Sequence, residues 1–166
     1  MSTFPTSATY VKVFGIGLVL AALGLGGYTW WQQATAAEAP ADAPTITVYK
    51  SPTCTCCGKW VDYLKANDWP VEVKTRPNVQ PTKQRLGVPR GLRSCHTATV
   101  GNYVLEGHVP APEIKKLLAE KPNVRGLTVP GMPVGSPGME GPNPDPYNVV
   151  AFLPDGRSYI FTKHQP

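Results

Sequence analysis

Three cysteines within four residues constrain this chain more than any other feature of its sequence. Cys54, Cys56 and Cys57 follow a β-branched run at residues 45–49 (TITVY) and precede a helical apolar pattern at residues 59–67 (KWVDYLKAN). The run predicts a strand and the pattern predicts a helix, so the cysteines occupy a loop at the start of a helix. Free N–H groups and the helix dipole favour thiolates there and lower thiol pKa values.

The region that follows alternates between strand and helix patterns. Pro70 ends the first helical pattern, and Gly101-Asn102 suits a tight hairpin turn between two short strands. The further predicted elements are strands at residues 71–75, 96–100 and 103–106 and helices at residues 82–86 and 112–120. The resulting order, β-α-β and then β-β-α, is typical of an α/β protein with a thioredoxin-like fold. We therefore predict a thioredoxin-like domain at residues 45–121.

The chain changes character after residue 121. Residues 122–146 are dense in proline and glycine, and the stretch GMPVGSPGMEG fills positions 131–141. Two further strands are predicted at residues 148–153 and 157–162, around the turn sequence Pro-Asp-Gly. We expect residues 122–166 to form a Gly/Pro-rich loop and a C-terminal hairpin, packed on the same domain.

The N-terminal region predicts a membrane or export signal. Residues 13–31 carry no charge and would span roughly 28 Å as a helix, close to the thickness of a bilayer core. Lys12 precedes this stretch and no Lys or Arg follows before Lys50, so the positive-inside rule places the N-terminus in the cytoplasm. The remainder of the chain would lie on the other side, which in a bacterium is the oxidising periplasm.

Two interpretations of this segment stay open. The small residues Ala34-Thr35-Ala36 would suit cleavage of a signal peptide, whereas the length of the apolar run suits an uncleaved inner-membrane anchor. We assign residues 1–36 to the signal or anchor segment. Residues 37–44, which include EAPADAP, read as an extended linker to the exported domain.

Composition excludes two broad classes. Charged residues make up 16% and hydrophobic residues 42% of the chain, which is inconsistent with wholesale disorder. The net charge of +5 comes from scattered Lys and Arg residues with no basic run and no interleaved aromatics. We therefore expect no nucleic-acid partner.

The fourth cysteine, Cys95, directly precedes a predicted strand. In a thioredoxin-like fold that loop packs beside the start of the first helix, so four sulfurs can converge on one small volume. One helix end carries only about half a positive charge and cannot neutralise several thiolates in contact, whereas a soft cation can. Structural zinc sites use two separated Cys knuckles, while the adjacent Cys56 and Cys57 suit a bridged cluster better. Soft thiolates select Cu(I), which makes copper the predicted metal.

Four other side chains are candidate ligands. His96 and His108 flank the predicted hairpin, and Met132 and Met139 lie in the Gly/Pro-rich loop. Imidazole and thioether groups would reinforce the choice of copper. The alternative for each histidine is a side chain at the edge of the hairpin, and for each methionine it is a hydrophobic plug under a long loop.

A disulfide framework is the alternative to a metal cluster, because exported proteins with an even number of cysteines commonly form disulfides. A bridge between the vicinal Cys56 and Cys57 would be strained. A bridge between Cys54 and Cys57 would leave two unpaired thiols.

Three stretches of the chain resemble a known family. They are YKSPTCTCCGKWVDYLK at residues 49–65, GVPRGLRSCHTATVGNYVLEGHVP at residues 87–110 and RGLTVPGMPVGSPGME at residues 125–140. These motifs are similar to the CopG-type copper-resistance proteins, formerly known only as a domain of unknown function. The resemblance covers about residues 45–162. It implies a thioredoxin-like fold in the periplasm and a copper cluster bound by Cys54, Cys56, Cys57 and Cys95, with redox work on copper.

Three functions follow from these observations. The first is a copper-binding oxidoreductase of periplasmic copper resistance, in which Cys54 and Cys57 are redox-active and other copper-handling proteins are partners. The second is a thiol-disulfide oxidoreductase, with Cys54 attacking and Cys57 resolving. The third is a copper chaperone or sink without turnover. Cys56 and Cys95 separate the first two, because a dithiol exchange enzyme has no use for extra thiols.

Overall fold

The computed structural model describes residues 40–165 of the chain. The predicted signal or anchor segment, residues 1–36, and residues 37–39 of the predicted linker lie outside those residues. Within residues 40–165, no helix has both the length and the apolar character needed to cross a membrane.

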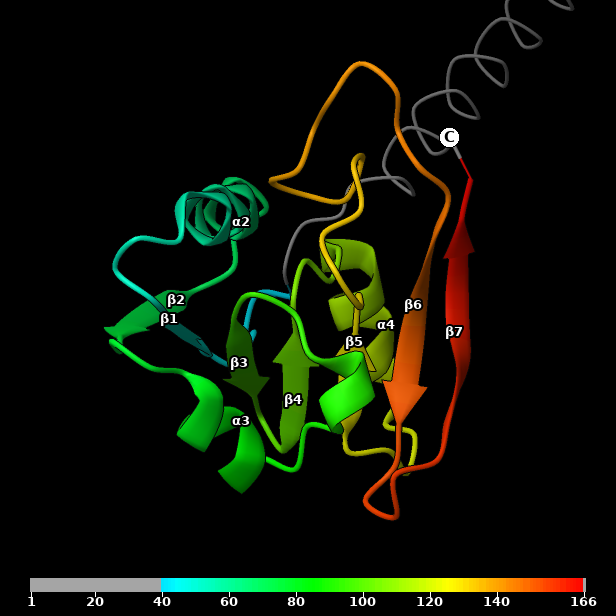
Figure 1. Ribbon diagram of the computed structural model, residues 1–166. Helices are drawn as coiled ribbons and strands as arrows, with labels where there is room; N and C mark the ends of the chain where they lie inside the picture. Colours follow the sequence, from blue (N-terminus) through cyan, green and yellow to red (C-terminus); the bar gives the residue numbers. More distant parts are fainter. Residues whose placement is uncertain (1–39, 166) are drawn as a thin grey trace, which may run out of the picture. The chain divides into compact units, whose positions relative to one another are not determined.

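The described chain is a mixed α/β structure built on one seven-stranded sheet, with strand order β2-β1-β3-β4-β5-β6-β7 (Figure 1). The strands are β1 (Ile46–Lys50), β2 (Val71–Thr75), β3 (Thr97–Val100), β4 (Tyr103–Glu106), β5 (Gly126–Thr128), β6 (Tyr147–Phe152) and β7 (Ser158–His164). The pairs β1–β2 and β4–β5 are parallel, and the other neighbours are antiparallel. The C-terminal hairpin of β6 and β7 thus extends the same sheet.

The helical elements pack against the sheet, and the buried apolar residues form two separate hydrophobic cores. The helical elements are α2 (Thr55–Ala66), α3 (Gln80–Arg85), the 3₁₀ helix η1 (Arg90–Leu92) and α4 (Ala111–Glu120). The larger core joins the apolar faces of α2 and α4 to the sheet, and the smaller one contains Val88, Val104 and Phe152. Val104 and Leu105 are neighbours in β4 but belong to different cores, since successive side chains of a strand point to opposite faces.

Most elements predicted from the sequence are confirmed, with ends that differ by one or two residues. The predicted cysteine loop is partly wrong, because α2 begins at Thr55. Cys54 is the extended N-cap residue, and Cys56 and Cys57 lie in the first turn of the helix. None of residues 55–58 is a proline, so the helix continues back to Thr55.

Strand β5 was not predicted from the sequence. It has only three residues, Gly126–Thr128, and lies in the segment rich in proline and glycine. It is a strand because its backbone pairs with β4 on one side and β6 on the other. Local sequence patterns do not report such long-range pairing.

A long loop at residues 129–146 connects β5 to β6 and reaches toward α2 (Figure 1). Gly138 comes so close to α2 that an added Cβ would lie 2.7 Å from the backbone nitrogen of Trp60. The loop is therefore packed against the helix end that carries the cysteines.

Candidate metal centre

Four cysteine sulfurs converge at the start of α2. Cys54, Cys56 and Cys57 come from the N-cap and first turn of the helix, and Cys95 comes from the segment just before β3. All four Sγ atoms lie within 4.8 Å of one another. The Sγ of Cys56 is 3.6 Å from that of Cys54 and 4.0 Å from that of Cys95. The predicted approach of Cys95 to the three-cysteine motif is thus confirmed.

Two of the four cysteines are paired. Cys54 and Cys57 form a disulfide, while Cys56 and Cys95 are free thiols. The disulfide that the sequence left as an alternative is therefore present, together with the two unpaired thiols that it implies. Reduction by two electrons and two protons would convert this oxidised form into a set of four thiols.

Two buried imidazoles stand against Cys95. The Sγ of Cys95 is 3.3 Å from Nδ1 of His96 and 3.2 Å from Nε2 of His108, and these three residues form a second group able to hold a metal ion. Both histidines are fully buried, so neither is a solvent-facing residue at the hairpin edge. Burial lowers the pKa of both, that of His96 well below its ordinary value. The rings are therefore neutral at pH 7, the state that binds metals.

The long loop holds one of these rings in place. Nδ1 of His108 is 2.7 Å from the carbonyl oxygen of Pro137, so this nitrogen carries the proton and donates a hydrogen bond to the carbonyl. Nε2 is then the basic nitrogen, and it faces Cys95. A backbone acceptor behind a ligand histidine is a common second-layer feature of metal sites.

The two candidate methionines separate clearly. Met132 places its Sδ 3.9 Å from the Sγ of Cys56 and leaves 51% of its surface exposed. Met139 is half-buried in the same loop, and within residues 40–165 its sulfur makes no hydrogen bond to a cysteine. Met132 therefore lies at the solvent-facing side of the cluster and is the methionine whose sulfur contacts a cysteine.

Burial dominates the acid-base behaviour of Cys95. Burial, together with a smaller contribution from the neighbouring Cys56, raises the pKa of this thiol to about 11. The thiol keeps its proton at neutral pH until a cation replaces that proton.

Trp60 packs against one of the imidazoles, with its ring centroid 4.4 Å from that of His96. Its indole N–H donates a hydrogen bond to the carbonyl of Val109.

A buried ion pair beneath Cys95 escaped the sequence analysis. Lys83 of α3 and Glu106 of β4 are both fully buried, and Glu106 also accepts a hydrogen bond from the backbone of Ser94. Burial raises the pKa of Glu106, and the adjacent ammonium group of Lys83 opposes that shift. In the sequence, a glutamate at the end of an apolar strand is only a weak sign of a buried charge. Nothing distinguished Lys83 from the other basic residues of the chain.

A family described as "Protein of unknown function, DUF411" matches residues 92–139, the segment that holds Cys95, both histidines and both methionines. A comparison with curated proteins found no significant match. Two solved structures, described as forms 1 and 2 of copper resistance protein CopG, are each 39% identical with a TM-score of 0.71. The alignment covers 75% of this chain and 100% of each of theirs, and at that identity over their whole length this chain belongs to the CopG family of copper-resistance proteins.

Proposed function

We propose that this chain is a periplasmic copper-binding protein that holds several Cu(I) ions in one thiolate cluster and changes the oxidation state of copper. The observation that carries the proposal is the convergence of four cysteine sulfurs within 4.8 Å. The solved relatives are described as copper resistance proteins, which makes copper the metal of choice.

The donor set fits a soft monovalent cation. Thiolates and thioethers select Cu(I), and imidazoles also bind copper. Cys56 lies at the centre of the set, with the sulfurs of Cys54, Cys95 and Met132 at 3.6, 4.0 and 3.9 Å. A sulfur with several close sulfur neighbours can bridge metal ions, which supports more than one copper per chain. In this proposal Cys54, Cys56, Cys57 and Cys95 are ligands, and His96, His108 and Met132 complete the site.

The disulfide supports a redox step with copper as the substrate. Two Cu(II) ions would each accept one electron from the thiols of Cys54 and Cys57. The products are two Cu(I) ions, the Cys54–Cys57 disulfide and two protons, so atoms and electrons balance. The remaining thiols of Cys56 and Cys95 would keep hold of Cu(I) after the disulfide forms.

The proposal includes a thioredoxin-like scaffold and export. The order β1-α2-β2 followed by β3-β4-α4, with β1 parallel to β2 and antiparallel to β3, supports a thioredoxin-like core. A disulfide is stable in an oxidising compartment, which supports the periplasm. The uncharged residues 13–31 would supply the signal peptide or inner-membrane anchor.

Metal analysis tests the binding proposal. Reduced, full-length protein is loaded with Cu(I) without oxygen, desalted and analysed for copper and zinc per chain, with the Cys56→Ser variant as a comparison. We expect more than one copper per wild-type chain and a clear loss in the variant. At most one copper per loaded wild-type chain, or zinc retained in place of copper, would contradict the proposal.

A second function has one observation in its favour, because a Cys54–Cys57 disulfide at a helix start also suits thiol-disulfide exchange. An insulin-reduction assay separates the two. Exchange activity that survives Cys56→Ser would favour the oxidoreductase of thioredoxin type. Adding Cu(II) to the reduced protein then tests copper redox: two Cu(I) formed per disulfide support it, whereas copper bound without disulfide formation identifies a passive chaperone or sink.

A further inference from the structure

We propose that the buried ion pair of Lys83 and Glu106 positions Cys95 for metal binding through the backbone of Ser94. The inference rests on the copper-binding function proposed above, and it assigns positioning roles to two residues that touch no metal. It also gives α3, which carries no ligand, a part in building the site.

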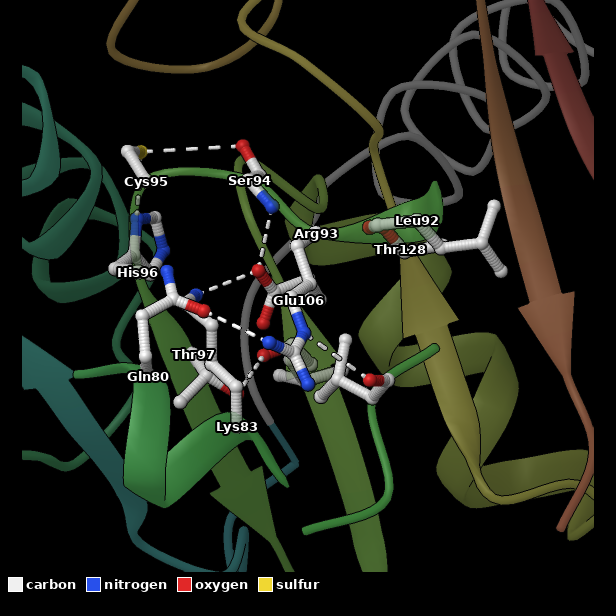
Figure 2. Close-up of polar contacts among 12 residues, drawn as sticks. Gln80, Lys83, Leu92, Arg93, Ser94, Cys95, His96, Thr97, Glu106 and Thr128 are labelled. Atoms are coloured by element: carbon white, nitrogen blue, oxygen red, sulfur yellow. Dashed lines mark hydrogen bonds and ion pairs between the residues drawn. The ribbon is translucent and has the colours of Figure 1, made fainter. Parts of the chain in front are cut away.

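The geometry connects α3 to the residue just before Cys95. Nζ of Lys83 donates to Oε1 of Glu106 over 2.6 Å, and the N–H of Ser94 donates to the same oxygen over 2.6 Å (Figure 2). Both charged side chains are 0% exposed. Oε1 of Glu106 therefore accepts one hydrogen bond from α3 and another from the segment that leads to Cys95.

Stability alone does not explain a pair of this kind. Removing two charges from water has a large desolvation cost, and replacing a buried ion pair by apolar residues is often neutral or stabilising. What apolar residues could not supply is an acceptor for the Ser94 N–H. A charged acceptor makes a stronger hydrogen bond to that N–H than a neutral one.

Further contacts hold the preceding residues in place. The guanidinium of Arg93 donates to the side chain of Gln80 in α3 over 2.8 Å, and Thr128 donates to the carbonyl of Leu92 over 2.8 Å. Figure 2 shows these contacts around the segment that leads to Cys95. Each of residues 92, 93 and 94 is therefore tied to a different part of the fold.

Close packing also fixes the side chain of Ser94. An added Cβ on Gly107, which has φ +71°, would lie 2.7 Å from both Cβ and Oγ of Ser94. The hydroxyl of Ser94 donates to the carbonyl of Gly131 in the long loop. Cys95 follows directly, so its distance from Cys56 depends on a backbone that the ion pair restrains. Metal sites need such supporting groups to hold their ligands in place.

A copper-free probe can measure this positioning. Phenylarsine oxide binds two thiols at once: two S–As bonds form and the arsenic oxygen leaves as water with the two thiol protons. In the metal-free, full-length protein with the Cys54–Cys57 disulfide closed, Cys56 and Cys95 are the free thiols among the described residues. Tight binding of the arsenical therefore reports that these two sulfurs are held together.

Two double variants separate positioning from charge. Lys83→Met with Glu106→Leu removes the ion pair and leaves Ser94 without its acceptor. Lys83→Met with Glu106→Gln removes the same charges but keeps a carbonyl oxygen that can accept from Ser94. Glu113→Leu is the matched control, because Glu113 is also a buried glutamate but bonds to His164 instead.

We expect the Lys83→Met, Glu106→Leu variant to bind the arsenical about tenfold to a hundredfold more weakly than wild type, the range expected for a lost hydrogen bond to a charged group. The affinity of the Lys83→Met, Glu106→Gln variant should stay within about threefold of wild type, and that of Glu113→Leu should equal wild type. Equal binding by both double variants, whether strong or weak, would overturn the proposal. So would equal weakening by the Glu113 control, since that would mark a general effect of core disruption.

Hydrogen exchange of the Ser94 amide gives a second measurement that needs no variant. We expect this amide in the wild-type protein to exchange at least a hundredfold more slowly than in an unfolded chain. Unprotected exchange would refute the positioning role even if the Lys83→Met, Glu106→Leu variant fails to fold. Copper loading of the same proteins is read separately. A wild type that binds the arsenical but no copper would refute the proposed function and leave the positioning role intact.

Discussion

Replacing Gly138 by alanine should separate the long loop from α2 and weaken copper binding. Gly138 has φ +82°, and an added Cβ would lie 2.7 Å from the nitrogen of Trp60 and 3.2 Å from the carbonyl oxygen of Cys56. Both are backbone atoms of the helix end and cannot rotate away. The loop must therefore move, and with it the Pro137 carbonyl that accepts the hydrogen bond from Nδ1 of His108.

The size of the effect follows from two contributions. A side chain in the left-handed region costs roughly 1–2 kcal/mol, and the lost hydrogen bond to His108 costs about 1 kcal/mol more. Gly156 is the matched control, because its φ of +87° is similar while nothing lies within 4 Å of an added Cβ. Gly156→Ala should therefore show only the first contribution.

Two assays measure the difference between the variants. Urea unfolding should give a free energy of unfolding about 1 kcal/mol lower for Gly138→Ala than for Gly156→Ala. Competition with a chromophoric Cu(I) chelator should show about tenfold weaker copper binding for Gly138→Ala only, equivalent to about 1.4 kcal/mol. Equal copper affinity in the two variants would refute the role of the loop in holding His108.

Three further predictions concern the sulfur ligands. Cys56→Ser should reduce the copper content of the purified protein about as much as Cys54→Ser does, and retention of full copper by Cys56→Ser alone would contradict the shared cluster. Because the pKa of Cys95 is raised from 9.0 to about 11 in the folded protein, the protonated thiol stabilises the fold fully below pH 9, and this stabilisation is lost as pH rises toward 11. Over that interval the free energy of unfolding of the metal-free wild type, measured in urea, should fall by about 2 kcal/mol more than that of Cys95→Ser. Parallel plots of unfolding free energy against pH for the two proteins would refute this. Met132→Leu should weaken Cu(I) binding severalfold while Met139→Leu leaves it unchanged, since only the sulfur of Met132 reaches Cys56; equal effects in the chelator assay would contradict that distinction.

The local elements of this protein were predictable because local patterns encode them. The β-branched run at residues 45–49 and the apolar face around Trp60 gave a strand and a helix close to the observed β1 and α2. The motif at Cys54, Cys56 and Cys57 placed three thiols at a helix start without any knowledge of the fold. Residue types and short spacings carry this information, so it is present in the sequence itself.

The tertiary structure decided which distant groups join those thiols. Cys56 and Cys95 are 39 residues apart and Cys56 and Met132 are 76 apart, and only the packing of β3 and the long loop brings their sulfurs together. The same packing buries both histidines and brings the sulfur of Met132, but not that of Met139, within hydrogen-bonding distance of Cys56, although the sequence presented the two methionines as equals. The support from Lys83 and Glu106 arises from the contact between α3 and β4, because a charge becomes a positioning group only where folding removes it from water.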